Sequence, residues 1–227
     1  MIHPEHQRRA YLQAMGIDVW LPRDAAEPED APVAAAGTAG AEDLDWDELR
    51  QCVADCTRCA LSLSRRQTVF GVGNQNADWM IVGEAPGAEE DRRGEPFVGP
   101  AGKMLDEMLR AIGLTRESVF VANTLKCRPP DNRDPKPTEA EACRDYLDRQ
   151  IELVQPKIIL AVGKIAAQNL LQCDDPVGRM RGTAHNYNGV PLVVTYHPAY
   201  LLRSPAQKRK TWSDLCLAMR LTVEGAA

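Results

Sequence analysis

Ile158-Ile159-Leu160-Ala161-Val162-Gly163 is the stretch that decides the fold class. It is short, apolar throughout, and followed by a segment with helical spacing that runs to about Leu171. Such a run is typical of a strand that is buried on both faces of a sheet. Three other runs share this character, and they cover residues 79–83, 119–122 and 191–195.

Segments with helical periodicity follow these runs at 101–112, 138–154 and 206–222. Buried strands that alternate with helices predict parallel pairing, with helices on both faces of the sheet. We therefore expect an α/β fold, a three-layer α/β/α sandwich with a central, mainly parallel four-stranded sheet. In such sheets, binding sites lie beyond the carboxyl ends of the strands.

The composition fits one folded domain with some additional length. The chain has 227 residues, of which 44% are hydrophobic and 26% are charged. It contains no apolar run of the roughly 18 residues that a membrane helix needs, and residues 1–5 do not begin a secretory signal. These observations predict a cytoplasmic protein without a membrane partner. In that reducing setting, the cysteines are expected to be metal ligands or free thiols.

Charge and composition divide the chain into three parts. Residues 1–50 hold 11 acidic and 4 basic side chains, whereas the other residues hold 21 and 23, so the acidic character belongs to the N-terminal part. Residues 24–44 are small, acidic and proline-containing, which predicts a disordered linker. We expect residues 1–23 to form a short arm that binds a partner or packs on the domain, and residues 45–227 to form the folded domain.

Four cysteines have a spacing that suits a metal centre. Cys56 and Cys59 form a CxxC pair, and Cys127 and Cys143 follow as two single residues. Thiolates from one tight pair and two distant positions can hold an iron–sulfur cluster or a zinc ion. Four unrelated buried thiols are the plain alternative. Cys52 adds a second alternative, because its spacing to the CxxC pair also occurs in radical enzymes that use S-adenosylmethionine.

Polar and aromatic residues follow several predicted strands. Glu84 and Glu90 lie in the first such loop, where carboxylates could orient or deprotonate water, and a solvated acidic loop is the plain alternative. Phe97 lies between turn residues, either as a packing residue or as a platform for a flat ligand. His197 follows the last strand, where a structural histidine is the more common interpretation.

Together these segments resemble the family 4 uracil-DNA glycosylases, bacterial and archaeal enzymes that carry a four-iron–four-sulfur cluster. The resemblance covers about residues 44–221. It rests on these stretches, in this order: Gly83-Glu84-Ala85-Pro86-Gly87 with Glu89-Glu90-Asp91, then Pro96-Phe97-Val98-Gly99-Pro100-Ala101-Gly102, then Asn123-Thr124-Leu125-Lys126-Cys127-Arg128-Pro129-Pro130, and His197-Pro198-Ala199-Tyr200-Leu201-Leu202-Arg203.

The resemblance implies hydrolysis of the N-glycosidic bond of deoxyuridine in DNA, with the base turned out of the helix into a pocket. It assigns catalysis to His197, with Glu90 and Glu84 as our candidates for a second catalytic group, and uracil binding to Phe97, Asn123, Gly83 and Ala85. It assigns DNA contacts to Leu201, Arg203, Lys126 and Arg128. The ligands that it implies for one structural [4Fe-4S] cluster are Cys56, Cys59, Cys127 and Cys143.

The chemistry of these residue types agrees with the implied roles. Phe97 is expected to stack on uracil, the Asn123 amide to recognise its O4 and N3 edge, and His197 to face the charge that develops on O2. Leu201 is expected to fill the gap left in the base stack, and Arg203 to contact a phosphate.

The water-activating group remains open in the sequence. Related glycosylases have an aspartate where this chain has Ala85, so we expect Glu90, or otherwise Glu84, to orient the water. A DNA-damage-binding protein of low turnover on the same scaffold is the alternative function. A third possibility is a sister branch that binds uracil-containing DNA covalently through a modified histidine loop.

The N-terminal arm carries a second resemblance. Residues 8–21 are similar to the N-terminal peptide of the psi subunit of the bacterial replicative clamp loader. That likeness implies the chi subunit as a partner, in addition to uracil-containing DNA. A protein with these partners is expected in the cytoplasm, in association with the nucleoid.

Overall fold

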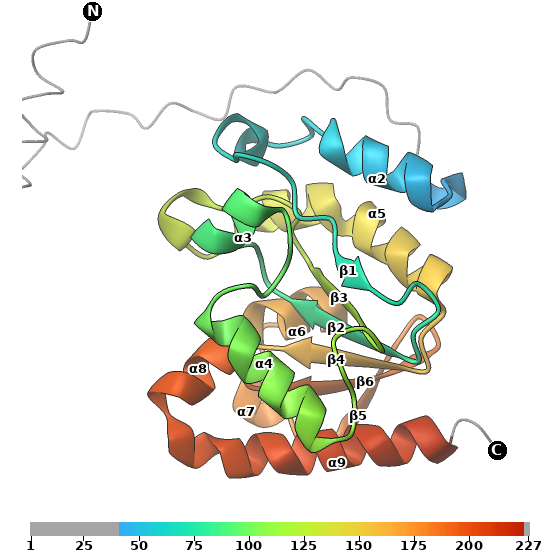
Figure 1. Ribbon diagram of the computed structural model, residues 1–227, viewed down its shortest axis with the longest axis vertical. Coiled ribbons are helices and arrows are strands. Elements are labelled where there is room, and N and C mark those ends of the chain that lie inside the picture. The colour runs from blue at the N-terminus through green and yellow to red at the C-terminus, as the bar shows by residue number, and fades with distance from the viewer. Residues whose placement is uncertain (1–40, 225–227) are drawn as a thin grey trace, which may run out of the picture. The chain divides into compact units, whose positions relative to one another are not determined.

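The computed structural model describes residues 41–224, and a six-stranded sheet runs through its centre (Figure 1). The strand order is β1-β3-β2-β4-β6-β5. The strands are β1 (Val72–Gly73), β2 (Trp79–Gly83), β3 (Phe120–Asn123), β4 (Ile158–Val162), β5 (Ala184–Tyr187) and β6 (Val190–Thr195).

The four strands predicted from the apolar runs form the parallel centre of this sheet, in the order β3-β2-β4-β6. The prediction of only four strands is wrong at both edges, where β1 and β5 pair antiparallel with β3 and β6. The β5–β6 hairpin turns at Asn188-Gly189, and both residues have positive φ. An Asn-Gly pair with this geometry is the usual two-residue hairpin turn, so the sequence did carry a signal for β5.

Helices cover both faces of the sheet, which confirms the predicted three layers. On one face α5 (Pro137–Val154), α6 (Lys164–Leu171) and α7 (Val177–Met180) bury alternate strand residues such as Val82 and Ala161. On the other face α4 (Pro100–Ala111), α8 (Pro198–Arg203) and α9 (Lys208–Glu224) bury the intervening residues. Because each central strand is buried on both sides, the apolar runs are continuous and do not alternate.

The folded part begins before the predicted boundary at residue 45. Ala41 is fully buried, and the Arg149 guanidinium donates a 2.7 Å hydrogen bond to the Leu44 carbonyl. The predicted linker, residues 24–44, is therefore four residues too long at its end. The predicted arm, residues 1–23, lies outside the described residues. No helix within 41–224 has the length and hydropathy of a membrane span.

Shorter elements complete the fold. Helix α2 (Trp46–Ala54) begins at Asp45, whose carboxylate accepts from the Asp47 and Glu48 amides, and it packs on α5. The others are α3 (Ala88–Arg93), η1 (Ala41–Asp43), η2 (Ala60–Leu63), η3 (Pro130–Asn132) and η4 (Pro205–Gln207). In Figure 1, β2 and β4 point toward the side where α3 and α8 lie, so the loops after the parallel strands meet at that edge.

Candidate active site

A cavity of about 500 Å³ lies at this edge of the sheet. Seven predicted site residues line it: Glu84, Ala85, Glu90, Phe97, Asn123, His197 and Arg203. They come from loops far apart in the sequence, and the parallel register explains their meeting, because Gly83 at the end of β2 pairs with Asn123 at the end of β3.

Gly83 lies directly behind two of the lining side chains. A Cβ at this position would come within 2.4 Å of Asn123 Oδ1 and 2.6 Å of Phe97 Cζ. Glycine is therefore required here so that the amide and the aromatic ring can approach the same strand end. The Asn123 side chain itself is buried, which makes it a rigid group at the cavity wall.

Phe97 has a strained backbone. Its φ is +54°, which is uncommon for a residue with a side chain, and such strain is concentrated at functional sites. Its ring is buried and stacks near His197, with ring centroids 5.8 Å apart and an interplanar angle of 28°. No pattern in the sequence indicated this strain.

Arg116 holds the strained segment in position. Its guanidinium donates to the Phe97 carbonyl at 2.8 and 3.0 Å and to the Pro96 carbonyl at 2.9 Å. Gly102 leaves room for the same carbonyl, because a Cβ there would lie 1.7 Å from Phe97 O. Asp106 Oδ1 lies 3.7 Å from Arg116 Nε.

His197 is held as a neutral hydrogen-bond donor. Its Nδ1 accepts a 3.1 Å hydrogen bond from the Ala199 amide, so the proton of the neutral ring is on Nε2. Burial, together with the nearby Arg203 cation, lowers the pKa of His197 to about 4, while Glu90 opposes the shift. Near pH 7 the imidazole is therefore uncharged.

Glu90 lines the cavity but is engaged by the backbone. One carboxylate oxygen accepts from the Gly87 amide at 3.2 Å, and the other accepts from the Val98 and Gly99 amides at 2.9 and 3.2 Å. These three hydrogen bonds join the start of α3 to the loop that carries Phe97. Glu90 therefore anchors this loop to α3. Because its oxygens already accept these amides, they are less available to orient a water molecule, the role predicted from the sequence.

Glu84 is the less constrained carboxyl group. Burial, together with the nearby Asp134 carboxylate, raises its pKa to about 7, while Lys164 opposes the shift. Its side chain forms no hydrogen bond within residues 41–224. A carboxyl group with a pKa near neutrality at a cavity wall is suited to proton transfer.

Two predicted DNA contacts are wrong. Leu201 is fully buried in the core, whereas the adjacent Leu202 is 46% exposed, so Leu202 and not Leu201 is the apolar side chain at the surface. Lys126 is 1% exposed, and its ammonium donates to the Asn123 carbonyl at 2.8 Å and to Gln150 Oε1 at 2.6 Å. A lysine held in this way cannot reach a phosphate.

Sequence reasoning missed Asn132 and Arg133, which also line the cavity. Asn132 has a positive φ of 53°, and its Oδ1 accepts a 2.8 Å hydrogen bond from Arg128. Arg133 forms a two-bond ion pair with the buried Glu139 at the start of α5. The remaining lining residues are Pro86, Gly87, Ala101, Pro129 and Ala199.

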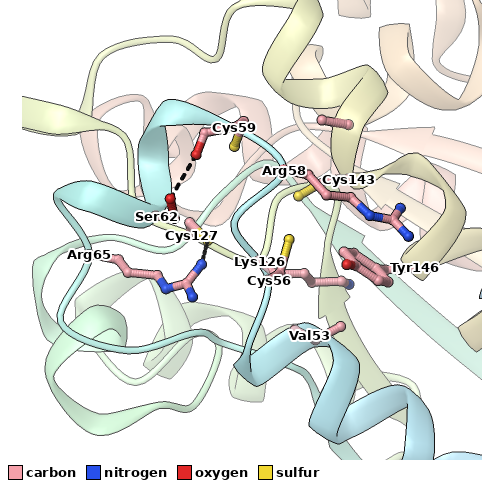
Figure 2. A pocket seen from close by; sticks show the side chains of 11 residues that line it. Val53, Cys56, Arg58, Cys59, Ser62, Arg65, Lys126, Cys127, Cys143 and Tyr146 are labelled. Carbon is pink, nitrogen blue, oxygen red and sulfur yellow. Dashed lines mark hydrogen bonds between the residues drawn. The ribbon is translucent and has the colours of Figure 1, made fainter. Parts of the chain in front are cut away.

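A second pocket collects the four cysteines of the predicted metal centre. Cys56 and Cys59 follow α2, Cys127 follows β3 and Cys143 lies on α5, and Figure 2 shows the four around one hollow. None of the seven cysteines forms a disulfide. Within residues 41–224, no three His, Cys, Asp or Glu side chains have the arrangement that holds a single metal ion.

Three cations border this pocket (Figure 2), and one of them, Arg58, is paired with Asp145 at 3.0 Å. The Arg65 guanidinium donates to Cys127 Sγ at 3.1 Å, and Lys126 lines the same space. The Lys126 ammonium has only neutral hydrogen-bond acceptors, and no carboxylate of the described chain forms an ion pair with it. A buried cation normally requires a counter-charge, so the pocket has the electrostatics of an anion-binding site.

Comparison with known proteins agrees with this geometry. The family model described as the uracil DNA glycosylase superfamily matches residues 70–216. The chain is 43% identical over 176 residues to the type-4 uracil-DNA glycosylase of Archaeoglobus fulgidus, a match that covers 74% of this chain and 88% of the relative. It is 44% identical over 181 residues to the type-4 enzyme of Saccharolobus solfataricus, covering 76% and 82%, and 42% identical over 164 residues to that of Thermotoga maritima, covering 70% and 85%.

Proposed function

The chain belongs to the uracil DNA glycosylase superfamily, and from that membership we propose that it excises uracil from DNA by hydrolysing the N-glycosidic bond, as its type-4 relatives are named for doing. The observation that carries this proposal is the single cavity that Phe97, Asn123 and His197 share. The product is an abasic site, which begins base excision repair.

The cavity residues supply recognition. The target atom is inaccessible inside a duplex, so the uracil turns out of the helix, and the Phe97 ring is the platform on which it stacks. The Asn123 amide accepts from N3–H and donates to O4. Cytosine presents the opposite pattern at these positions and would leave buried polar groups unpaired.

His197 supplies stabilisation of the leaving group. As the glycosidic bond breaks, negative charge develops on uracil O2, and the Nε2–H of a neutral imidazole can donate to it without a change of protonation. A donor fixed in advance toward such a charge typically contributes about 3 kcal/mol. The Nδ1 hydrogen bond from Ala199 supports this role because it keeps the ring in the required tautomer.

Glu84 is our candidate for orienting or deprotonating the water, in preference to Glu90, whose oxygens already accept three amides. We expect the single-turnover rate to fall about tenfold per pH unit below the Glu84 pKa of about 7, because only the carboxylate is active. The Glu84→Gln variant should lose this dependence and have a lower plateau. The measurement is the excision rate from pH 5 to 9.

The pH dependence of stability should be opposite to that of the excision rate: the rate rises with pH, whereas the contribution of Glu84 to stability falls. The pKa of Glu84 is raised above its ordinary value in the folded protein, so the folded state binds the proton more tightly than the unfolded state. Between pH 4.5 and about 7 this group therefore makes stability fall as pH rises. Glu84→Gln should raise the melting temperature at pH 8 while slowing excision. If the excision rate of Glu84→Gln had the same pH dependence as that of the wild type, Glu84 would be excluded from proton transfer.

Arg116 is expected to act through Phe97. Arg116→Ala removes three hydrogen bonds from the strained segment, so we expect roughly tenfold weaker binding of free uracil and a similar loss in excision rate, with partial rescue in Arg116→Lys. Asp106→Ala is the matched control, because it removes only the 3.7 Å ion pair. A lower melting temperature in Arg116→Ala without any change in uracil binding would contradict this positioning role.

We also propose that Cys56, Cys59, Cys127 and Cys143 hold one [4Fe-4S] cluster. The donor set fits, since four thiolates around such a cluster carry net negative charge, and the pocket is bordered by Arg65 and the otherwise unpaired Lys126. Hydrolysis transfers no electrons, so the cluster's task is structural. It would join the segment after α2 to the loop after β3 and to α5.

One assay tests the proposed activity. The purified protein is incubated with an oligonucleotide that carries a single deoxyuridine, and abasic sites are then cleaved with alkali. Strand scission at the uracil supports the proposal. Tight binding without scission would instead support the alternative of a DNA-damage-binding protein of low turnover.

Two proposals rest on the sequence alone. Binding of the chi subunit by residues 1–23 depends on the likeness to the psi peptide, and those residues lie outside the described part of the chain. Association with the nucleoid follows only from DNA as the substrate.

A further inference from the structure

The segment that follows His197 carries an unbalanced positive charge. Residues 176–213 contain six lysines and arginines and no aspartate or glutamate. Two of the six, Arg179 and Arg181, pair with Asp175 and Asp214 outside that range. The other four, Arg203, Lys208, Arg209 and Lys210, lie within eight positions and are all exposed. We call these four residues the basic rim.

The basic rim differs from other charged surfaces of the described chain. Exposed cations elsewhere often have acidic partners, as Arg110 has Glu107 and Lys157 has Asp78. None of the four rim side chains forms an ion pair or a hydrogen bond within residues 41–224. Their charge is therefore not neutralised within this part of the molecule and is available to an anionic partner.

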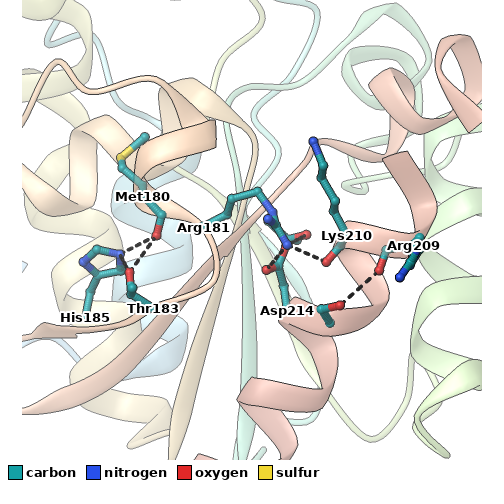
Figure 3. A network of polar contacts seen from close by, with 9 residues as sticks. Met180, Arg181, Thr183, His185, Arg209, Lys210 and Asp214 are labelled. Atoms are coloured by element: carbon teal, nitrogen blue, oxygen red, sulfur yellow. Dashed lines mark hydrogen bonds and ion pairs between the residues drawn. The ribbon is translucent and has the colours of Figure 1, made fainter. Parts of the chain in front are cut away.

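The rim is also fixed with respect to the cavity. Figure 3 shows Arg181 donating to the Lys210 carbonyl, at 2.7 Å, and pairing with the fully buried Asp214. Asp214 in turn accepts a 2.9 Å hydrogen bond from Thr195, the last residue of β6 and two positions before His197.

The rim side chains are left free by this network. In Figure 3 the Lys210 ammonium points away from the Arg181–Asp214 pair. At the other end of the rim, Arg203 lines the cavity itself. The four cations therefore extend from the mouth of the cavity along η4 to the first turn of α9, on a backbone that these contacts join to the end of β6, the strand that precedes His197.

We propose that the basic rim binds consecutive phosphates of the substrate strand on one side of the extruded nucleotide. The inference rests on the proposed function, because it assigns to the rim the strand whose base enters the cavity. Phosphates suit the rim because they form an evenly spaced row of negative charge, and lysine and arginine neutralise such rows with release of counterions. The contact would set affinity without reading sequence.

The test compares two arginines of α9. Arg209→Ala and Arg220→Ala each remove one exposed charge from the same helix, but Arg209 is in its first turn and Arg220 is near its other end. We measure Kd for a deoxyuridine oligonucleotide as a function of salt. Arg209→Ala should weaken binding several-fold at low salt and reduce the slope of log K against log salt by about 0.7 to 0.9, the value for one lost phosphate contact. Arg220→Ala should keep the wild-type slope.

A triple variant, Lys208→Ala with Arg209→Ala and Lys210→Ala, should lower the slope by about two to three. If it and Arg220→Ala both bind with the wild-type slope, the rim does not contact DNA, and a different acidic partner becomes the explanation of its charge. The result is independent of catalysis. A wild-type protein that fails to release uracil would overturn the proposed function. Equal salt slopes for the triple variant and the wild type would overturn only the proposal that the basic rim binds phosphates.

Discussion

His197→Ala is expected to lower the single-turnover rate of uracil excision by about 10²- to 10³-fold, the usual loss when one donor to a developing oxyanion is removed. The donor is the Nε2–H, whose presence follows from the 3.1 Å hydrogen bond that Nδ1 accepts from Ala199. The loss should fall on the chemical step, and DNA affinity should change little. Rates measured with enzyme in excess over substrate separate the two.

A second substitution separates catalysis from folding. His197 is the N-cap of α8, so His197→Ala also removes a cap, at a cost of about 1 kcal/mol in stability. Asparagine is a strong N-cap but has no group at the Nε2 position. His197→Asn should therefore keep the melting temperature near that of the wild type while excision stays as slow as in the alanine variant.

His185→Ala is the matched control, because His185 lies on edge strand β5 and contacts the Met180 carbonyl. It should excise uracil at close to the wild-type rate. Glu90→Ala should cost less in rate than His197→Ala but more in stability, since it leaves three amides without their acceptor. Rates for His197→Ala within fivefold of the wild type would remove the histidine from the mechanism.

The pH profile should carry no titration of His197 near neutrality. Its pKa of about 4 keeps the ring neutral throughout the range in which Glu84 ionises. A loss of rate on the acidic side is therefore assigned to Glu84, and it should vanish in Glu84→Gln.

The centre of the fold was predictable because strands that are buried on both faces consist of continuous apolar residues, a pattern that is easily identified in a sequence. The four parallel strands appear as apolar runs, and loops at their carboxyl ends hold most of the cavity residues. The edge strands have a weaker sequence pattern. β1 has only two residues, and β5 reads Ala-His-Asn-Tyr, with one of its four side chains buried.

The errors in the site have local causes. In a helix of six residues, periodicity cannot decide whether Leu201 or Leu202 faces the core. Lys126 is buried because it lies between the end of β3 and the cysteine pocket, whereas lysines are usually exposed. The role of Arg116 could not be predicted from the sequence, because it consists of hydrogen bonds to the carbonyl of the strained residue Phe97, 19 residues earlier in the chain.

The second large effect is expected at the cysteine pocket. Cys143→Ser should reduce iron and inorganic sulfide from four each per chain to near zero, and it should lower the melting temperature strongly. Cys143 is a buried residue of α5, and losing the anionic centre leaves Lys126 and Arg65 without their counter-charge. An uncompensated buried charge costs roughly 3 to 5 kcal/mol, a large part of the stability of a typical domain.

Cys173→Ser is the control, since Cys173 is a partly buried thiol beside Met180 and lines no part of this pocket. It should retain metal and stability.

Excision should also fail in Cys143→Ser, because Lys126 donates to the Asn123 carbonyl and so connects the pocket to the group that recognises uracil. Zinc in the wild-type protein, or iron retained by Cys143→Ser, would contradict the cluster. Neither result would affect the assignment of His197, which depends only on the cavity at the carboxyl ends of the strands.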